Sequence, residues 1–169
     1  MYMFLDLTAP QSLLPIPSLA ALVRQQWAAR VNAQVGARFD RFARSLLVTP
    51  AQCQDAAIKT AGIVRCLNSE YWGSESCSDN CIIGGSWGKG TQGRPPRDVD
   101  VIFVLPYSTY LRFQNRDGNR QSQLLQEIKN ALSAKYSSTR MRGDGQVVVV
   151  DFTSGHGVEV APAFKLTNG

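Results

Sequence analysis

Two acidic residues separated by a single residue, Asp98 and Asp100, are the residues in this sequence whose types and spacing best suit chemistry. They begin an apolar, β-branched run that is too short for a helix and is predicted to be a strand, Val99–Leu105. Alternate side chains of a strand share a face, so the two carboxylates would lie about 6.6 Å apart along the chain. Carboxylates that close raise each other's pKa unless a cation lies between them. Mg²⁺, which prefers oxygen ligands, is the expected cation, with Mn²⁺ as a substitute.

A third carboxylate from a neighbouring strand would complete a site for two metal ions. Glu159, in a later apolar run, is the best candidate, and Asp151 is the alternative. In such a site one ion activates an attacking hydroxyl while the other steadies a triphosphate leaving group. The sequence therefore predicts metal-assisted transfer of a phosphorus-containing group.

The glycine-rich run GGSWGKGT, at 84–91, is the second candidate for a site element. A P-loop would need Gly five positions before Gly88 and Ser or Thr directly after Lys89. Ile83 and Gly90 occupy those two positions, so the spacing excludes a P-loop. What remains is a Gly-Ser element at the end of a predicted strand, twelve positions before Asp98.

That Gly-Ser element suits a phosphate ligand in another way. Gly84 and Gly85 allow the backbone to approach a phosphate closely, and Ser86 offers a hydroxyl and an N–H. Lys89 and Arg97 are expected to offset triphosphate charge. Trp87 is interpreted as an anchor for this loop, with stacking on a base as the alternative.

The elements before the Gly-Ser run are predicted to be helical. Apolar residues recur at steps of three and four from Ser18 to about Leu47, which indicates one amphipathic helix, or two helices broken at Gly36. Thr49 as N-cap and Pro50 at the first helical position start a further helix that ends before Gly73.

The remaining elements predict a mixed sheet. Cys81–Ile83 is a short strand, a third helix carries the periodic residues 124–136, and the runs 147–152 and 158–160 form a hairpin with His156 at its tip. The fold class is therefore α+β, with about four strands and helices packed on one face. The domain division is an N-terminal helical segment, 1–48, and a catalytic core, 49–169.

Composition narrows the function classes only slightly. The 169 residues carry a formal net charge of +5, are 44% hydrophobic and include four irregularly spaced cysteines. No signal peptide or membrane span is recognisable, and no second Cys/His pair completes a zinc site. We therefore expect a cytoplasmic protein with reduced thiols and no membrane partner.

Three sequence runs together resemble a known family. GGSWGKGT followed by DVDVIFVLP resembles the signature of the polymerase β-like nucleotidyltransferases, and VEVAPAF at 158–164 is similar to the third-carboxylate strand of one branch. That branch includes cGAS, the oligoadenylate synthetases and the bacterial CD-NTases of anti-phage (CBASS) systems. The similarity extends over roughly 39–164 and includes the helix QSQLLQEIKNAL and the run MRGDGQVVVV.

The resemblance implies a nucleotidyltransferase fold and a function. Asp98, Asp100 and Glu159 would be metal ligands, while Gly85, Ser86 and Thr91 would lie against the triphosphate, although Glu159 stands where Asp is frequent. Members join ATP or GTP into cyclic or linear oligonucleotide second messengers, releasing pyrophosphate, and a regulatory protein or an effector that responds to the product is a possible partner. A helical C-terminal lobe, expected from the family, has no counterpart in the sequence.

Two further readings stay open. One is a nucleotidyltransferase that acts on another acceptor, such as an RNA 3′ end, a small molecule or a protein. The other is a degenerate nucleotide-binding domain without activity. The presence of all three carboxylates and of the Gly-Ser pair argues against it. No nucleic-acid-binding module pattern is visible, and the 18 Lys and Arg residues are spread along the chain.

Overall fold

A computed structural model of the chain describes residues 18–95 and 97–166. The chain divides into two units, Met1–Arg44 and Ser45–Gly169. Helix α1 (Leu19–Leu46) is unbroken at Gly36, so the single helix is confirmed and the alternative of two helices is not. A single glycine costs a helix only about 1 kcal/mol, which the turns on either side can absorb. No residue of α1 is buried.

Helix α2 (Pro50–Trp72) begins and ends where the sequence predicts. Thr49 Oγ1 accepts a hydrogen bond from the Gln52 N–H, and Gln52 Oε1 accepts one from the Thr49 N–H, at 3.2 and 2.9 Å. The helix ends at Gly73, whose φ of 62° is the left-handed conformation that favours glycine. These two caps fix where α2 starts and where it ends.

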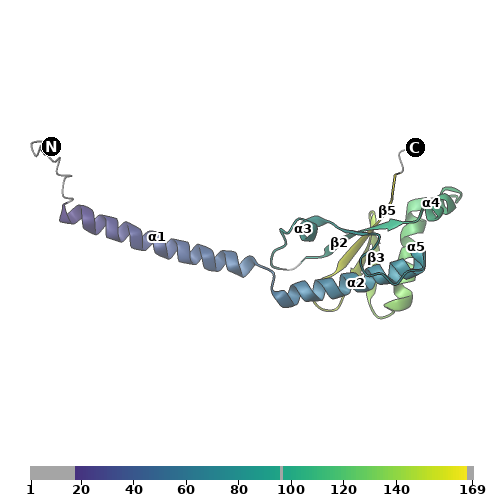
Figure 1. Cartoon of the computed structure of the whole chain (residues 1–169), viewed down its shortest axis with the longest axis horizontal. Coiled ribbons are helices and arrows are strands. Elements are labelled where there is room, and N and C mark those ends of the chain that lie inside the picture. Colours follow the sequence, from purple (N-terminus) through teal and green to yellow (C-terminus); the bar gives the residue numbers. More distant parts are fainter. Residues whose placement is uncertain (1–17, 96, 167–169) are drawn as a thin grey trace, which may run out of the picture. The chain divides into compact units, whose positions relative to one another are not determined.

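The sheet has five strands in the order β1-β2-β5-β4-β3. Figure 1 labels β2, β3 and β5. Strand β2 pairs in parallel with β5, and the other neighbours are antiparallel, so the sheet is mixed as predicted. The strands are β1 (Cys81–Ile83), β2 (Val99–Leu105), β3 (Arg140–Asp144), β4 (Val147–Asp151) and β5 (Val158–Phe164).

The core lies between the sheet and two helices. Every second residue of β2 is buried, from Val99 to Leu105, and packs in one cluster with apolar residues of α2 and of α5 (Arg120–Lys135). Burial of that apolar area supplies the main driving force for this arrangement. The predicted α+β fold with helices on one face is confirmed, and the other face of β2 carries half-buried side chains such as Asp100.

Three elements escape the sequence patterns. Strand β3 has one buried residue, Met141, and forms a hairpin with β4 through Gly145, whose φ is 59°. Helices α3 (Gly85–Gly88) and α4 (Tyr107–Gln114) are too short for a helical period to stand out. The predicted count of about four strands is therefore one too low, because an exposed edge strand such as β3 needs few apolar residues.

The predicted pairing of the runs 147–152 and 158–160 is confirmed as β4 against β5, with Val148 opposite Val160. None of the described helices is both long and apolar enough to cross a membrane.

Candidate active site

Asp100 and Glu159 lie directly opposite one another on the parallel strands β2 and β5. Both are half-buried, while their strand neighbours Val101 and Val160 are fully buried on the helix-covered face. The alternation of the two strands therefore places the two carboxylates together on the uncovered face.

Two of the predicted metal ligands, Asp98 and Asp100, act electrostatically on the third, Glu159. Burial raises the pKa of the Glu159 carboxyl, and the negative charges of Asp98 and Asp100 raise it further. Among residues 18–95 and 97–166, no three His, Cys, Asp or Glu side chains are close enough to hold a metal ion as they stand. The donor set still fits a divalent cation, because a cation would relieve the repulsion that Glu159 experiences.

Asp151, the alternative third carboxylate, lies at the end of β4 and is paired with arginine. Arg142 Nη1 donates to Asp151 Oδ2 at 2.5 Å. Its charge is thus already offset, whereas Glu159 is the register partner of Asp100. The geometry favours Glu159 over Asp151.

Two glycines leave room for the aspartates. Gly85 has a φ of 54°, and a Cβ there would overlap the Asp100 carboxylate. A Cβ at Gly157 would overlap Oδ1 of Asp98. The N–H of Gly84 also donates to the Asp100 carbonyl oxygen at 2.8 Å, which ties the start of α3 to β2. The glycine-rich run is therefore packed against the Asp100 carboxylate, and Gly157 against that of Asp98.

A pocket of about 300 Å³ adjoins the Gly-Ser element. It gathers three residues that the sequence assigns to the nucleotide: Ser86, Thr91 and Arg97. Arg94 also lines the pocket, and the sequence analysis did not assign it to the nucleotide. Its position close to Arg97 in the sequence is the signal that could have identified it. Lys89 is exposed at the C-terminal end of α3 and does not line the pocket.

His156 lies in the loop between β4 and β5 but, unlike an ordinary hairpin-tip residue, is only 1% exposed. The rings of His156 and Trp87 contact each other edge to face, with their centroids 5.0 Å apart. Trp87 therefore anchors the glycine-rich loop, which agrees with the interpretation favoured from the sequence.

The fold is shared with a solved protein structure. CdnC of E. coli MS115-1, in a structure of its complex with HORMA-deltaN, matches with a TM-score of 0.53 and 19% identity, over 76% of this chain and 41% of that one. This chain and CdnC therefore share a fold.

Two further structures are similar. CdnE cyclic dinucleotide synthase of Elizabethkingia meningoseptica, with GTP and Apcpp, has a TM-score of 0.46 and 15% identity over 70% of this chain and 45% of its own. CdnE c-UMP-AMP synthase of Rhodothermus marinus, with Apcpp and Upnpp, has a TM-score of 0.41 and 18% identity over 72% and 48%. The chain spans less than half the length of each of the three.

The family is established by sequence. The model of the Second Messenger Oligonucleotide or Dinucleotide Synthetase (SMODS) domain matches residues 34–169, well over half of the chain. The chain belongs to this family of nucleotidyltransferases. Among curated proteins, none matches it significantly.

Proposed function

We propose that this chain is the catalytic part of a Mg²⁺-dependent enzyme that joins nucleoside triphosphates, ATP or GTP, into a cyclic or linear oligonucleotide second messenger. The observation that carries the proposal is the pairing of Asp100 with Glu159 across two parallel strands, beside Asp98. Membership of the SMODS family supports the same reaction. Residues 49–169 would form the catalytic core and 1–48 an N-terminal helical segment.

In the proposed reaction a ribose hydroxyl oxygen of one nucleotide bonds to the α-phosphorus of another. The bond from that phosphorus to the pyrophosphate breaks, and the hydroxyl proton passes to solvent. Asp98, Asp100 and Glu159 would hold the divalent metal, which when bound lowers the pKa of the hydroxyl and offsets charge on the phosphates. The half-buried setting of these carboxylates strengthens each interaction relative to bulk water.

The pocket beside α3 would hold the polyphosphate. Ser86 and Thr91 can donate hydroxyl hydrogen bonds, and the guanidinium groups of Arg94 and Arg97 can donate to phosphate oxygens in pairs. Gly85 would let the phosphates and Asp100 approach the same backbone segment. Lys89, at the exposed end of α3, would act only as a distant positive charge.

A defence role against phage and a regulatory partner or effector complete the proposal. The E. coli CdnC structure is a complex with HORMA-deltaN, and we propose that a regulatory protein also binds the present enzyme. A cytoplasmic location suits a soluble triphosphate substrate.

The test is to incubate the full-length protein with each radiolabelled nucleoside triphosphate and Mg²⁺ or Mn²⁺, and to resolve the products. We expect a labelled oligonucleotide that disappears in the double variant Asp98→Asn/Asp100→Asn. The matched control is Asp79→Asn/Asp117→Asn, which makes the same charge change at two exposed positions. Undiminished product from the first variant rules out the metal-site assignment. Label transferred only to RNA, a small molecule or a protein would show that the acceptor is different.

A further inference from the structure

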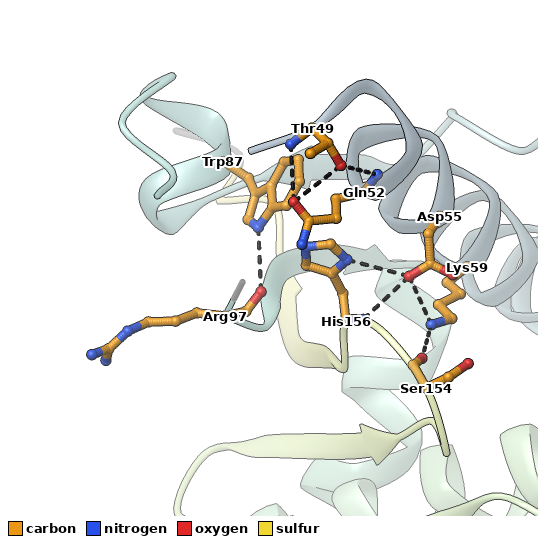
Figure 2. Close-up of polar contacts among 8 residues, drawn as sticks. All are labelled: Thr49, Gln52, Asp55, Lys59, Trp87, Arg97, Ser154 and His156. Atoms are coloured by element: carbon orange, nitrogen blue, oxygen red, sulfur yellow. Dashed lines mark hydrogen bonds and ion pairs between the residues drawn. The ribbon is translucent and has the colours of Figure 1, made fainter. Parts of the chain in front are cut away.

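The buried imidazole of His156 is not used by the proposed reaction, yet it is held firmly. Asp55 Oδ2 on α2 accepts hydrogen bonds from both the backbone N–H and Nδ1 of His156, each at 3.2 Å. A carboxylate can only accept, so Nδ1 carries a proton. Nε2 is buried without a partner among the described residues. Figure 2 shows His156 between Asp55 and Trp87.

The loop that carries His156 is fastened to α2 at a second point. Lys59 Nζ donates to Asp55 Oδ2 at 2.8 Å and also to the Ser154 carbonyl oxygen (Figure 2). The same ammonium group lies 5.0 Å from the centroid of the Phe152 ring. A Cβ on Gly155 would overlap the Asp55 carboxylate, so the loop and the helix are in close contact.

On its other side, His156 meets the segment that carries the Gly-Ser pair. Its ring contacts Trp87 edge to face, at an interplanar angle of 80°. Trp87 Nε1 donates in turn to the Arg97 carbonyl oxygen at 3.5 Å (Figure 2). One imidazole therefore connects α2 with α3 and with the residue just before Asp98.

The next residue, Gly157, completes the connection. Its carbonyl oxygen accepts a hydrogen bond from the Val99 N–H at 3.0 Å, and a Cβ on it would overlap Asp98 Oδ1. Glu159 follows two positions later. Ser86 thus adjoins Trp87, Asp98 adjoins Arg97, and Glu159 is three residues from His156. We define the His156 linkage as the set Asp55, Lys59, Ser154, His156, Trp87 and the Arg97 carbonyl.

We propose that His156 is a positioning residue, which fixes the mutual placement of Ser86, Asp98 and Glu159 by fastening their three segments to α2. Its role in catalysis rests on the proposed function, whereas its mechanical role does not. Residues that orient metal ligands from outside the coordination shell typically change affinity or activity by about 10- to 100-fold when replaced.

The experiment compares His156→Leu, which keeps bulk but removes the donor, with His156→Asn, whose amide can replace Nδ1–H. Trp87→Phe keeps a ring but removes the donor to Arg97. The control is Ile128→Val, a change at a fully buried position on α5. In full-length protein we expect His156→Leu to lower kcat about 10- to 100-fold with a smaller change in KM, and His156→Asn to recover part of it.

Amide hydrogen exchange provides the readout that does not depend on activity. We expect faster exchange in His156→Leu at Val99, whose N–H donates across to Gly157, and at Gly88 and Thr91, whose N–H groups donate within the glycine-rich run, to Gly84 and Ser86. We expect no such change in Ile128→Val. Faster exchange confined to 152–157, with kcat unchanged, overturns the proposal. If the wild type makes no product, the proposed function fails while hydrogen exchange still decides the linkage. If His156→Leu does not fold, His156→Asn and Trp87→Phe carry the same test.

Discussion

Glu159 faces Asp100 across the only parallel strand pair among the described residues, and its charge is disfavoured there. Burial, followed by repulsion from Asp98 and Asp100, raises the pKa of the Glu159 carboxyl. A carboxyl with a raised folded-state pKa favours the fold when protonated, and that stability is lost as pH rises through the folded value. At neutral pH and without a metal ion, the negative charges of Asp98 and Asp100 therefore repel that of Glu159.

It follows that Glu159→Gln should raise the melting temperature in EDTA at pH 7.5, because it removes the repelling charge. The gain should shrink towards zero below about pH 4, where Glu159 is protonated in both states. Mg²⁺ should raise the melting temperature of the wild type and leave that of the variant nearly unchanged.

Thermal melts in EDTA and in Mg²⁺, at pH 4 and pH 7.5, measure both effects. The control is Glu75→Gln, the same charge change at an exposed side chain. A variant that melts below the wild type in EDTA at pH 7.5 contradicts the repulsion.

Gly85→Ala should abolish most of the activity. The left-handed φ of 54° costs a residue with a Cβ about 1–2 kcal/mol, and the new methyl group would displace the Asp100 carboxylate. A displacement near 1 Å at a reacting centre costs about 100-fold in rate. Product formation by purified, folded variant measures it.

The matched control is Gly143→Ala on β3, where a Cβ meets nothing within 4 Å and φ is not positive. It should keep near-wild-type activity. Equal losses in Gly85→Ala and Gly143→Ala would mean that the packing against Asp100 is irrelevant.

Thr49→Ala should lower stability by about 1 kcal/mol, because the N-cap of α2 loses its side-chain acceptor. For a chain of this size the melting temperature should fall by about 3 °C. Thr49→Ser keeps the hydroxyl and should melt close to the wild type. An unchanged melting temperature in Thr49→Ala would show that α2 does not depend on this cap.

Asp55→Asn should make stability less sensitive to acid. Hydrogen bonds from Lys59, and then from His156, lower the pKa of the Asp55 carboxyl, so its contribution is present above about pH 4 and is lost as pH falls through the lowered value. The carboxylate is partly exposed, so the effect should be below about 1 kcal/mol. Urea unfolding at pH 7 and pH 3 measures it: the gap between variant and wild type should narrow at pH 3. The control is Asp117→Asn, the same charge change at an exposed aspartate.

The parts of the fold that the sequence predicts are those with strong local signals. The cap at Thr49, the left-handed stop at Gly73 and the bounds of β2 depend on adjacent residues and are confirmed. Strand β3 could not be predicted, because an edge strand with a single buried residue, Met141, has no alternating pattern.

The candidate site divides in the same way. The spacing of Asp98 and Asp100 is local and readable, whereas the choice of Glu159 over Asp151 depends on strand register and on the pairing of Asp151 with Arg142. Burial of His156 depends on α2, a hundred residues earlier, and no local pattern records it. The roles of these residues in catalysis stay predictions until the variants are assayed.

The parallel pairing of β2 with β5 has a consequence for how the protein is made. Everything from Pro106 to Gly157 must be synthesised before Glu159 can come to lie opposite Asp100. Contacts between residues so distant in sequence form slowly, because the long intervening loop must close first. A chain translated no further than Val158 therefore holds only two of the three carboxylates, and we expect ion affinity to appear only once β5 has been synthesised and the sheet has closed.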